Sequence, residues 1–347
     1  MLRGGQAVGE RADSVPYAGR CRMQVTVLAG GYGGARMAHG FALEADRRAA
    51  RSEELLELTV IGNTADDLEV HGLHVAPDLD TVMYTLAGLA NVTTGWGVRD
   101  ETWSASEMLE RYSEPTWFRL GDRDLATHIV RTKRLRAGER LTTVTVALCA
   151  GLGIRSRLLP VTDGRLRTKI RTGDGWLEFQ DYFVRRRHAD DVHEVRFDGL
   201  SEVTATPEAL AAIGSADLIV VAPSNPFVSV APVLEVSGVL AAVLANQNPV
   251  IGVSPIVGGE ALRGPAAAMM RQQGYEATAT GVAAFYAERY PGLLDVLALD
   301  TADADQAEPV RRAGIRPLVT PTVMYEEQDR RALAVALLEA AARNMPE

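Results

Sequence analysis

The sequence predicts an α/β protein: a Rossmann-like, doubly wound, mainly parallel sheet with a small helical insertion and an antiparallel sheet extension. From Gln24 onward, short apolar runs rich in β-branched residues alternate with helical patterns, which is typical of βαβ units. Loops rich in Gly, Ser, Asn, Asp or Pro follow four of the five runs, as at the carboxyl ends of parallel strands. The runs are QVTVLA (24–29), LTVIG (58–62), DLIVVA (217–222), PVIGVS (249–254) and LDVLAL (294–299).

Two stretches interrupt this alternation. Residues 82–138 have mostly helical patterns and form the predicted insertion, with helices expected over 82–89, 105–112 and 125–134. Residues 141–204 alternate and contain turn signals, so we expect antiparallel strands there, beginning with LTTVTVAL. An amphipathic helix is expected to close the chain. The predicted organisation is a disordered tail over residues 1–22, followed by one Rossmann-like domain over 23–347 that the insertion at 82–138 interrupts.

Composition excludes several classes of function. The 347 residues are 47% hydrophobic and 23% charged, as in ordinary globular proteins. The formal net charge of -9 argues against nucleic-acid binding, which requires a dominant basic face. No 18-residue apolar run and no apolar signal segment is present, so we expect a cytoplasmic protein without membrane contact. Lys133 and Lys169 are the only lysines, so an anion site would use arginines or backbone N–H groups.

A glycine-rich loop follows the first predicted strand. Gly30, Gly31, Gly33 and Gly34 precede a helical pattern, where glycine lets the backbone approach a phosphate held by helix N-terminal N–H groups. The loop departs from a dinucleotide fingerprint, because Arg36 stands where the third glycine would fall. We therefore favour phosphate binding over NAD binding, with tight strand–helix packing as the alternative.

Carboxylates gather after the second predicted strand. Asp66 and Asp67 follow that strand, and Asp78 and Asp80 come shortly afterwards within PDLDT (77–81). Carboxylates on neighbouring loops, together with substrate phosphates, suit Mg²⁺. The alternative is that single aspartates only cap helices.

A charged segment, RLGDRD (119–124), lies within the predicted insertion and is followed by His128 and Arg131. His128 and Arg131 are three residues apart and so share one face of a helix. Such a face could bind an anionic substrate. The alternative is a solvated helix start that Asp122 or Asp124 caps.

Two further loops end predicted strands. Ser224 and Asn225 stand between Pro223 and Pro226, and Ser254 opens the loop after PVIGVS. Such rigid loops can direct side chains at a ligand, although a plain turn is the alternative. No nucleophile constellation is present, so we expect metal-assisted, electrostatic chemistry of the phosphoryl-transfer type.

These motifs together resemble the 2-phospho-L-lactate transferases of coenzyme F-420 biosynthesis. The resemblance covers about residues 23–330 and rests on motifs that occur in the family's order. They are GGYGG (30–34), GNTADD (62–67), PDLDT (77–81), LGDRD (120–124) through His128, PSNP (223–226) and VSPI (253–256).

The resemblance implies a Mg²⁺-assisted, dimeric transferase. Its donor is a guanosine diphosphate-type nucleotide that bears a three-carbon acid on its terminal phosphate, in other words a guanylylated acid. The ribityl hydroxyl of the deazaflavin Fo (7,8-didemethyl-8-hydroxy-5-deazariboflavin) attacks the distal phosphorus and GMP leaves, giving (dehydro)coenzyme F-420-0. The acid is derived from phosphoenolpyruvate in actinobacterial members and is phospholactate in archaeal ones. The arginine-rich composition favours the actinobacterial branch, but the residues leave the choice of acid open.

The resemblance also implies roles for single residues. Asp80 matches a deazaflavin-contacting aspartate of the family, and Arg119 falls where some members have a lysine at the same site. We place His128 with them as deazaflavin-binding. Asp66, Asp67 and Asp80 are the candidates for catalysis and metal binding. The candidates for nucleotide binding are Gly30, Gly31, Gly33, Gly34, Asn63, Thr64, Ser224, Asn225 and Ser254.

Two other interpretations compete with the transferase. Gluconeogenesis-factor-like proteins share the fold, the glycine loop and the Ser-Asn-Pro motif, and bind nucleotide sugars as regulators without turnover. The segment from Leu120 through His128 to Arg131 favours the transferase over them. An NAD-dependent oxidoreductase is disfavoured by Arg36 and by Asn63, which stands where an acidic residue would hold a ribose.

Overall fold

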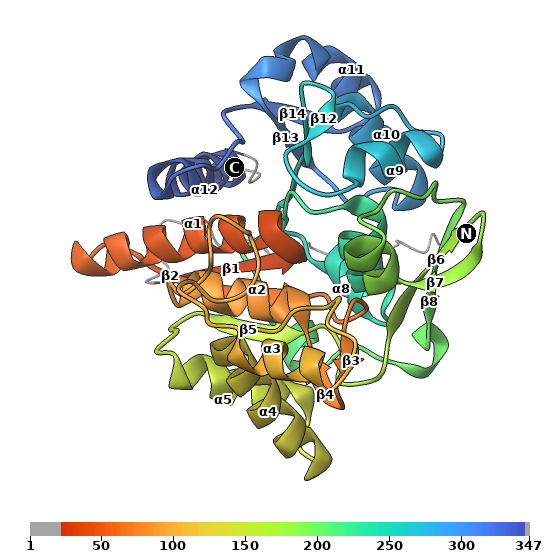
Figure 1. The fold of residues 1–347 in the computed structure, drawn as a ribbon. Helices are drawn as coiled ribbons and strands as arrows, with labels where there is room; N and C mark the ends of the chain where they lie inside the picture. The colour runs from red at the N-terminus through yellow and green to blue at the C-terminus, as the bar shows by residue number, and fades with distance from the viewer. Residues whose placement is uncertain (1–21, 344–347) are drawn as a thin grey trace, which may run out of the picture.

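The computed structural model describes residues 22–343, so the tail expected over residues 1–22 lies outside the described residues except for Arg22. A seven-stranded sheet, parallel at every pairing, forms the centre of the molecule (Figure 1). Its order is β14-β13-β10-β9-β1-β2-β5. The strands are β1 (Arg22–Ala29), β2 (Leu55–Gly62), β5 (Arg157–Pro160), β9 (Leu218–Val221), β10 (Val250–Val253), β13 (Val296–Leu299) and β14 (Arg316–Val319).

Helices cover both faces of this sheet, because successive strand residues point to opposite sides and both sides are apolar. In β1, for example, Val25 and Val27 belong to one core and Leu28 to the other. The first core lies under α1 (Gly31–Ala50), α2 (Pro77–Leu86), α5 (Leu141–Gly151) and α12 (Glu327–Ala342). The second lies under α6 (Pro207–Ser215), α7 (Ala231–Glu235), α8 (Val239–Ala245), α9 (Ala266–Gln272), α10 (Ala279–Arg289) and α11 (Ala307–Arg312).

The predicted fold class is thus confirmed, including the five predicted central strands. The topology also locates a crevice. From β1 the chain continues to β2 and β5 on one side, whereas β9, β10, β13 and β14 lie on the other. The strand order therefore reverses between β1 and β9, and open α/β sheets bind ligands at the carboxyl ends of the strands beside such a point.

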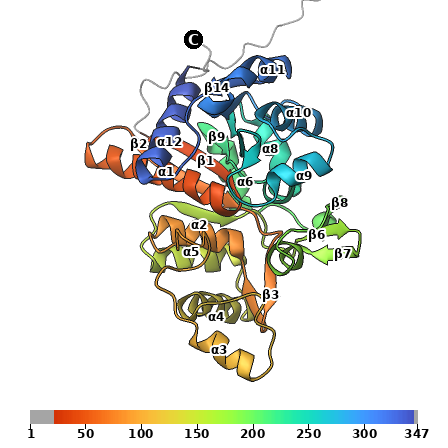
Figure 2. The same cartoon turned by 45° about the horizontal axis from the view of Figure 1, so that its top comes forward.

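The helical insertion is present beyond α2. It consists of α3 (Ser104–Arg111) and α4 (Asp122–Arg136), with the hairpin of β3 (Leu68–Val70) and β4 (Leu73–Val75) beside them. Figure 2 shows this group at the end of the molecule away from α11. Each of its helices takes its N-terminal cap from the other helix's entry segment. The Asp122 carboxylate accepts from the N–H groups of Ser104 and Ala105, while Glu101 accepts from those of Arg123 and Asp124.

The stretch from 141 to 204 differs from the prediction in two ways. LTTVTVAL is not a strand but the start of α5. Its buried residues Leu141, Val144, Thr145 and Cys149 repeat with helical spacing, and this outweighs the β preference of its valines and threonines. The antiparallel strands are present, but they form a sheet of their own, β7-β6-β8, rather than joining the central one. They are β6 (Arg167–Thr172), β7 (Gly175–Glu178) and β8 (Glu194–Asp198).

The remaining elements are short. β11 (Ile256–Val257) and β12 (Glu260–Ala261) form a small hairpin, and Asp181–Arg185, Leu200–Glu202, Pro226–Val230 and Thr301–Gln306 form short helical segments, the last of them kinked at Asp303. The predicted closing helix is α12. No helix within residues 22–343 is long and apolar enough to span a bilayer. The proposed domain boundaries and the homodimer stay predictions.

Candidate functional site

The glycine loop and the Pro223–Pro226 loop meet at the reversal point of the sheet. The Ser224 hydroxyl donates to the Gly30 carbonyl at 2.6 Å, and the Gly30 N–H approaches the same hydroxyl at 3.4 Å. A Cβ at Gly33 would lie 2.1 Å from the Pro223 carbonyl oxygen, so only glycine allows the two loops to approach this closely. Close packing is therefore a reason for Gly33, alongside any contact with phosphate.

Gly30 and Gly31 face the acidic loops instead. Gly31 has a φ of +58°, and its N–H group donates to the carboxylate of Asp78. The side-chain amide of Asn63 donates to Asp78 as well, at 2.9 Å, while its oxygen accepts from the N–H of Ala65 at 2.9 Å. Asn63 therefore links the end of β2 to the start of α2 and fixes the acidic residues beside the glycine loop.

Three buried aspartates form what we call the open acidic cluster: Asp66, Asp67 and Asp78. The pKa of Asp66 is raised well above its usual value, first by burial and then by the carboxylates of Asp78 and Asp67. Burial also raises the pKa of Asp78 to about 6, with the carboxylate of Asp67 adding to the effect. The structure therefore gathers buried carboxyl groups whose ionised forms its own residues, Arg167 among them, compensate only in part.

Unpaired oxygens accompany this charge. One carboxylate oxygen of Asp66, one of Asp67 and the hydroxyl oxygen of Thr64 are buried without a hydrogen-bond partner among the described residues. The other Asp67 oxygen lies 2.9 Å from His74 Nε2. Buried oxygens without partners cost free energy, which a bound cation or substrate can recover.

Asp80 belongs to a different group, which we call the closed network, with Tyr84, Asp124, His128 and Arg131. The buried Arg131 guanidinium donates to both oxygens of Asp80, one at 3.0 Å and the other in a shorter contact. His128 is 1% exposed and lies 3.1 Å from Asp124, which also accepts from the Tyr84 hydroxyl at 2.7 Å. Their charged groups pair with one another inside the molecule, although His128 Nε2 and Arg131 Nε lack a hydrogen bond among the described residues.

Arg119 is the one predicted deazaflavin-binding residue that lies at the surface. Its guanidinium stacks 4.4 Å from the centre of the Trp103 ring. Asp80 and His128 lie below the surface in the closed network, so the structure does not bring the three candidates to one exposed site.

The last two candidates for nucleotide binding follow neighbouring strands and are held by local turns. Asn225 accepts from the N–H of Phe227 at 2.9 Å. The Ser254 hydroxyl donates to the Ile256 carbonyl at 2.9 Å. Both loops therefore lie at the carboxyl edge of the sheet with the glycine loop, in conformations that their own side chains stabilise.

Asp78, which the sequence groups with Asp80, has different partners from Asp80 in the structure. The signal was present: Pro77 favours the first turn of a helix. Residues two apart on a helix point in different directions, so Asp78 faces the glycine loop and Asp80 faces α4.

The open acidic cluster fits Mg²⁺ in part. No group of three or more His, Cys, Asp or Glu side chains within residues 22–343 is arranged as a complete metal site. Mg²⁺, however, keeps several waters and is commonly bound by one or two carboxylates plus substrate phosphates. The unpaired oxygens of Asp66 and Asp67 belong to carboxylates of this kind.

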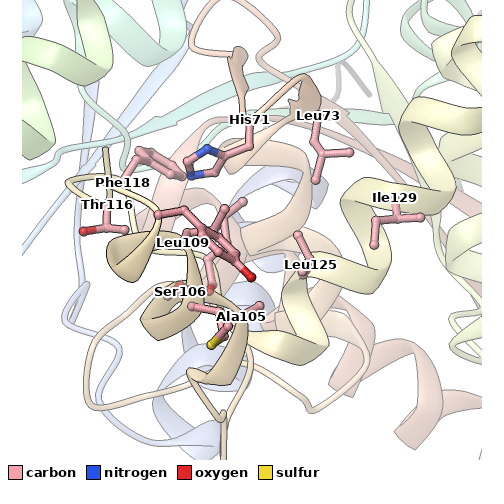
Figure 3. Close-up of a pocket in the computed structure, with 12 residues that line it drawn as sticks. His71, Leu73, Ala105, Ser106, Leu109, Thr116, Phe118, Leu125 and Ile129 are labelled. Atoms are coloured by element: carbon pink, nitrogen blue, oxygen red, sulfur yellow. Dashed lines mark hydrogen bonds between the residues drawn. The ribbon is translucent and has the colours of Figure 1, made fainter. Parts of the chain in front are cut away.

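An apolar cavity of about 480 Å³ lies in the insertion, between α3, α4 and the β3–β4 hairpin (Figure 3). None of the candidate site residues lines it. Its lining is mostly aliphatic and aromatic, and the Ser106 hydroxyl is already bonded to the Leu120 carbonyl at 2.7 Å. The cavity therefore lacks the groups that phosphoryl transfer requires.

The fold and site define a class: a doubly wound α/β protein with a glycine loop and a charged, incompletely paired acidic cluster at the carboxyl edge of its sheet. Comparison with known proteins then identifies the family, because the model of 2-phospho-L-lactate transferase CofD matches residues 25–338. The chain belongs to this family, as its motifs indicated, and is a transferase.

Individual relatives agree with this assignment. The chain is 44% identical to the phosphoenolpyruvate transferase of Streptomyces griseus over 324 residues, which cover 92% of this chain and 98% of that protein. It is 43% identical to the phosphoenolpyruvate transferase of Mycobacterium avium, with 90% and 99% covered. A crystal structure of a UPF0052-family protein from Bacillus halodurans has a similar fold, with a TM-score of 0.63 at 15% identity, covering 91% of this chain and 99% of that one.

Proposed function

We propose that this chain acts in coenzyme F-420 biosynthesis and transfers a phosphoenolpyruvyl group from a guanosine diphosphate-linked donor to the terminal ribityl hydroxyl of Fo, with release of GMP. The choice of acid is supported by the relatives at 43–44% identity that are named phosphoenolpyruvate transferases. The chemistry is supported by one observation above all, the open acidic cluster beside the glycine loop.

The donor would lie across the reversal point of the sheet. Its phosphates would approach the glycine loop and the N-terminus of α1, where the helix dipole and the N–H groups of the first turn other than that of Gly31 would stabilise negative charge. The guanosine would extend toward Ser224, Asn225 and Ser254 on the neighbouring loops.

Mg²⁺ would be held by the unpaired oxygens of Asp66 and Asp67, and when bound it supplies neutralisation of the diphosphate. The remaining steps fall to the chain itself. Asp78, with a pKa of about 6, is suited to accept the proton of the attacking hydroxyl near neutral pH. The oxygen–phosphorus bond to Fo forms, the bond to the GMP oxygen breaks, and the proton passes to Asp78.

Asp80 has a supporting role in this proposal. Its carboxylate is engaged by Arg131, so it holds α2 against α4 and thereby positions Asp78 two residues before it. This replaces the expectation that Asp80 itself binds metal, contacts Fo and activates the hydroxyl.

Incubation of the purified protein with Fo, Mg²⁺ and guanylylated phosphoenolpyruvate, with guanylylated phospholactate in parallel, tests the proposal. Mass spectrometry should detect the Fo phosphodiester, and chromatography an equal amount of GMP. If only guanylylated phospholactate gives product, the transferred acid is phospholactate and not phosphoenolpyruvate. Absence of product from both donors, with guanine nucleotide still bound, would overturn the proposal in favour of a nucleotide-binding regulator.

A further inference from the structure

The loop over residues 91–97 presents an exposed tryptophan beside the glycine loop. Trp96 is 47% exposed, although the loop around it is tightly hydrogen-bonded. The Asn91 side chain accepts from the N–H groups of Thr93 and Thr94, and the Gly95 N–H donates to the Asn91 carbonyl at 2.8 Å. An ordered loop that keeps a large apolar ring in solvent is a feature typical of binding surfaces.

Arg263 fastens this loop to the body of the protein. Its guanidinium donates to the carbonyls of Thr94 at 2.6 Å and Thr93 at 3.3 Å. The same guanidinium stacks 4.3 Å from the ring centre of Tyr32, which lies inside the glycine loop. One side chain therefore joins the insertion to the loop that faces the open acidic cluster.

Aromatic and cationic groups continue outward from this contact. Trp96 meets Trp103 edge to face, with ring centres 6.2 Å apart and planes at 67°. Arg119 in turn stacks over Trp103. These aromatic and cationic side chains therefore extend from Tyr32 in the glycine loop, where Gly31 bonds to Asp78, to Arg119 on the insertion.

We infer that Trp96 stacks on the planar ring system of the acceptor and that Arg263 is the positioning residue that holds it there. This inference rests on the proposed function and adds to it a ring-binding surface. A fused heteroaromatic ring offers a flat face to an indole, and neighbouring guanidinium groups favour an electron-rich or anionic ring. The ribityl chain would then extend toward the open acidic cluster, where its terminal hydroxyl reacts.

The first test is the affinity for Fo, measured by titration calorimetry on Trp96→Ala and Trp96→Phe. Loss of base–aromatic stacking costs about 1–3 kcal/mol in alanine variants, so Trp96→Ala should weaken Fo binding about 5- to 150-fold. Trp96→Phe should recover most of that affinity. The KM for the guanylylated donor should stay unchanged in both variants, because the Trp96 ring packs against Trp103 of the insertion, away from the proposed donor loops.

Trp176 offers a matched control. It is 39% exposed and lies under a guanidinium, that of Arg196 at 4.3 Å, but it stands on β7 of the separate antiparallel sheet. Trp176→Ala removes a comparable exposed indole and should leave Fo affinity at the wild-type value. An equal loss in both alanine variants would show a general effect of removing a surface indole and would overturn the inference.

A double-mutant cycle tests the positioning role of Arg263. Arg263→Ala should weaken Fo binding by itself, and adding it to Trp96→Ala should cause little further loss, because both changes remove the same contact. Arg263→Lys should not restore affinity, since an ammonium group cannot bond two carbonyls and stack on Tyr32 as the planar guanidinium does.

The outcomes separate this inference from the proposed function. If the wild-type protein neither binds Fo nor consumes it, the proposed function is wrong. If the wild-type protein binds and converts Fo while Trp96→Ala matches it in affinity, the proposed function stands and the role of Trp96 is refuted.

Discussion

Two neighbouring groups of buried aspartates differ in whether other residues of the protein pair with their carboxylates. In the open acidic cluster, Asp66 and Asp78 are buried, their pKa values are raised, and oxygens of the cluster lack partners. In the closed network, Asp80 is bound by Arg131, and hydrogen bonds from His128 and Tyr84 lower the pKa of Asp124 against the opposing effect of burial. Residue type and burial are the same, so the difference lies in the neighbours.

This difference distinguishes a structural role from a functional one. A buried charge that is paired within the protein supports the fold. A buried charge without a partner lowers stability and is typical of a site that binds an ion or ligand. The same substitution should therefore have opposite effects on the stability of the two groups.

The largest effect is expected in the closed network. Asp80→Asn leaves the buried Arg131 charge without its carboxylate and should lower the free energy of unfolding by about 3–5 kcal/mol. Urea denaturation measures this. Asp46→Asn is the control, because its pair with Arg155 is exposed on both sides, and it should change stability by less than about 1 kcal/mol. Equal stability of the Asp80→Asn variant and wild type would mean that the closed network is not a stabilising unit.

Asp66→Asn should show the reverse pattern. Removing an uncompensated buried charge should raise the free energy of unfolding in metal-free buffer, by roughly 1–3 kcal/mol. Turnover should fall at least about 100-fold, because the variant loses an oxygen that we propose binds the metal. Steady-state kinetics and urea denaturation on the same preparation measure turnover and the free energy of unfolding. If the variant is less stable than wild type, or nearly as active, the proposed difference between the open acidic cluster and the closed network is wrong.

The pH dependence of stability provides a smaller, reversible test. The pKa of Asp78 is about 6 in the folded protein against 3.8 ordinarily, so the folded state binds the extra proton between about pH 4 and pH 6. Its contribution is therefore favourable at low pH and is lost as the pH rises through 6. We expect the melting temperature of the metal-free protein to fall by a few degrees over this range, and less in Asp78→Asn.

Mg²⁺ alone should reverse that fall. It should raise the melting temperature at pH 8, above the pKa of Asp78, and have little effect at pH 5, below that pKa. An equal shift at both pH values would show that the ion binds elsewhere.

The smallest effect concerns Arg119, the exposed counterpart of the buried Arg131. Arg119→Ala removes one stacking cation at the surface, an interaction worth about 0.5–1 kcal/mol, and should raise the KM for Fo about 2- to 5-fold while lowering the free energy of unfolding by no more than about 1 kcal/mol. Arg196→Ala, which removes the guanidinium over Trp176, should leave this KM at the wild-type value. An unchanged KM in Arg119→Ala would exclude Arg119 from the acceptor site.

The central strands were predictable because both faces of each are buried, so their sequences are continuously apolar. The two strands that sequence reasoning missed, β5 and β14, form the edges of the sheet. Each contains an arginine and a proline, which edge positions tolerate and central ones do not. A search for continuous apolar runs, which identifies central strands, therefore does not detect these two edge strands.

The site was predictable only as far as motif positions allow. Asp66 and Asp67 were assigned correctly to the end of β2. The partners of Asp80 were not apparent, because Arg131 is 51 residues away and only the packing of α2 on α4 brings the two together. The sequence predicted a loop after Pro77, where the structure has α2. The different directions of Asp78 and Asp80 follow from the helical geometry of α2, so the predicted loop did not reveal them.

The reciprocal capping of α3 and α4 has a consequence for how the insertion can vary. Each helix begins on a carboxylate from the other's entry segment, so neither N-terminus is complete alone. The two should form and melt together as one cooperative unit, detectable as a common amide-exchange rate. For protein engineering, the segment from Glu101 to Arg136 is a single exchangeable module: grafts that carry only one of the two helices should fail, whereas a graft of both keeps its own caps.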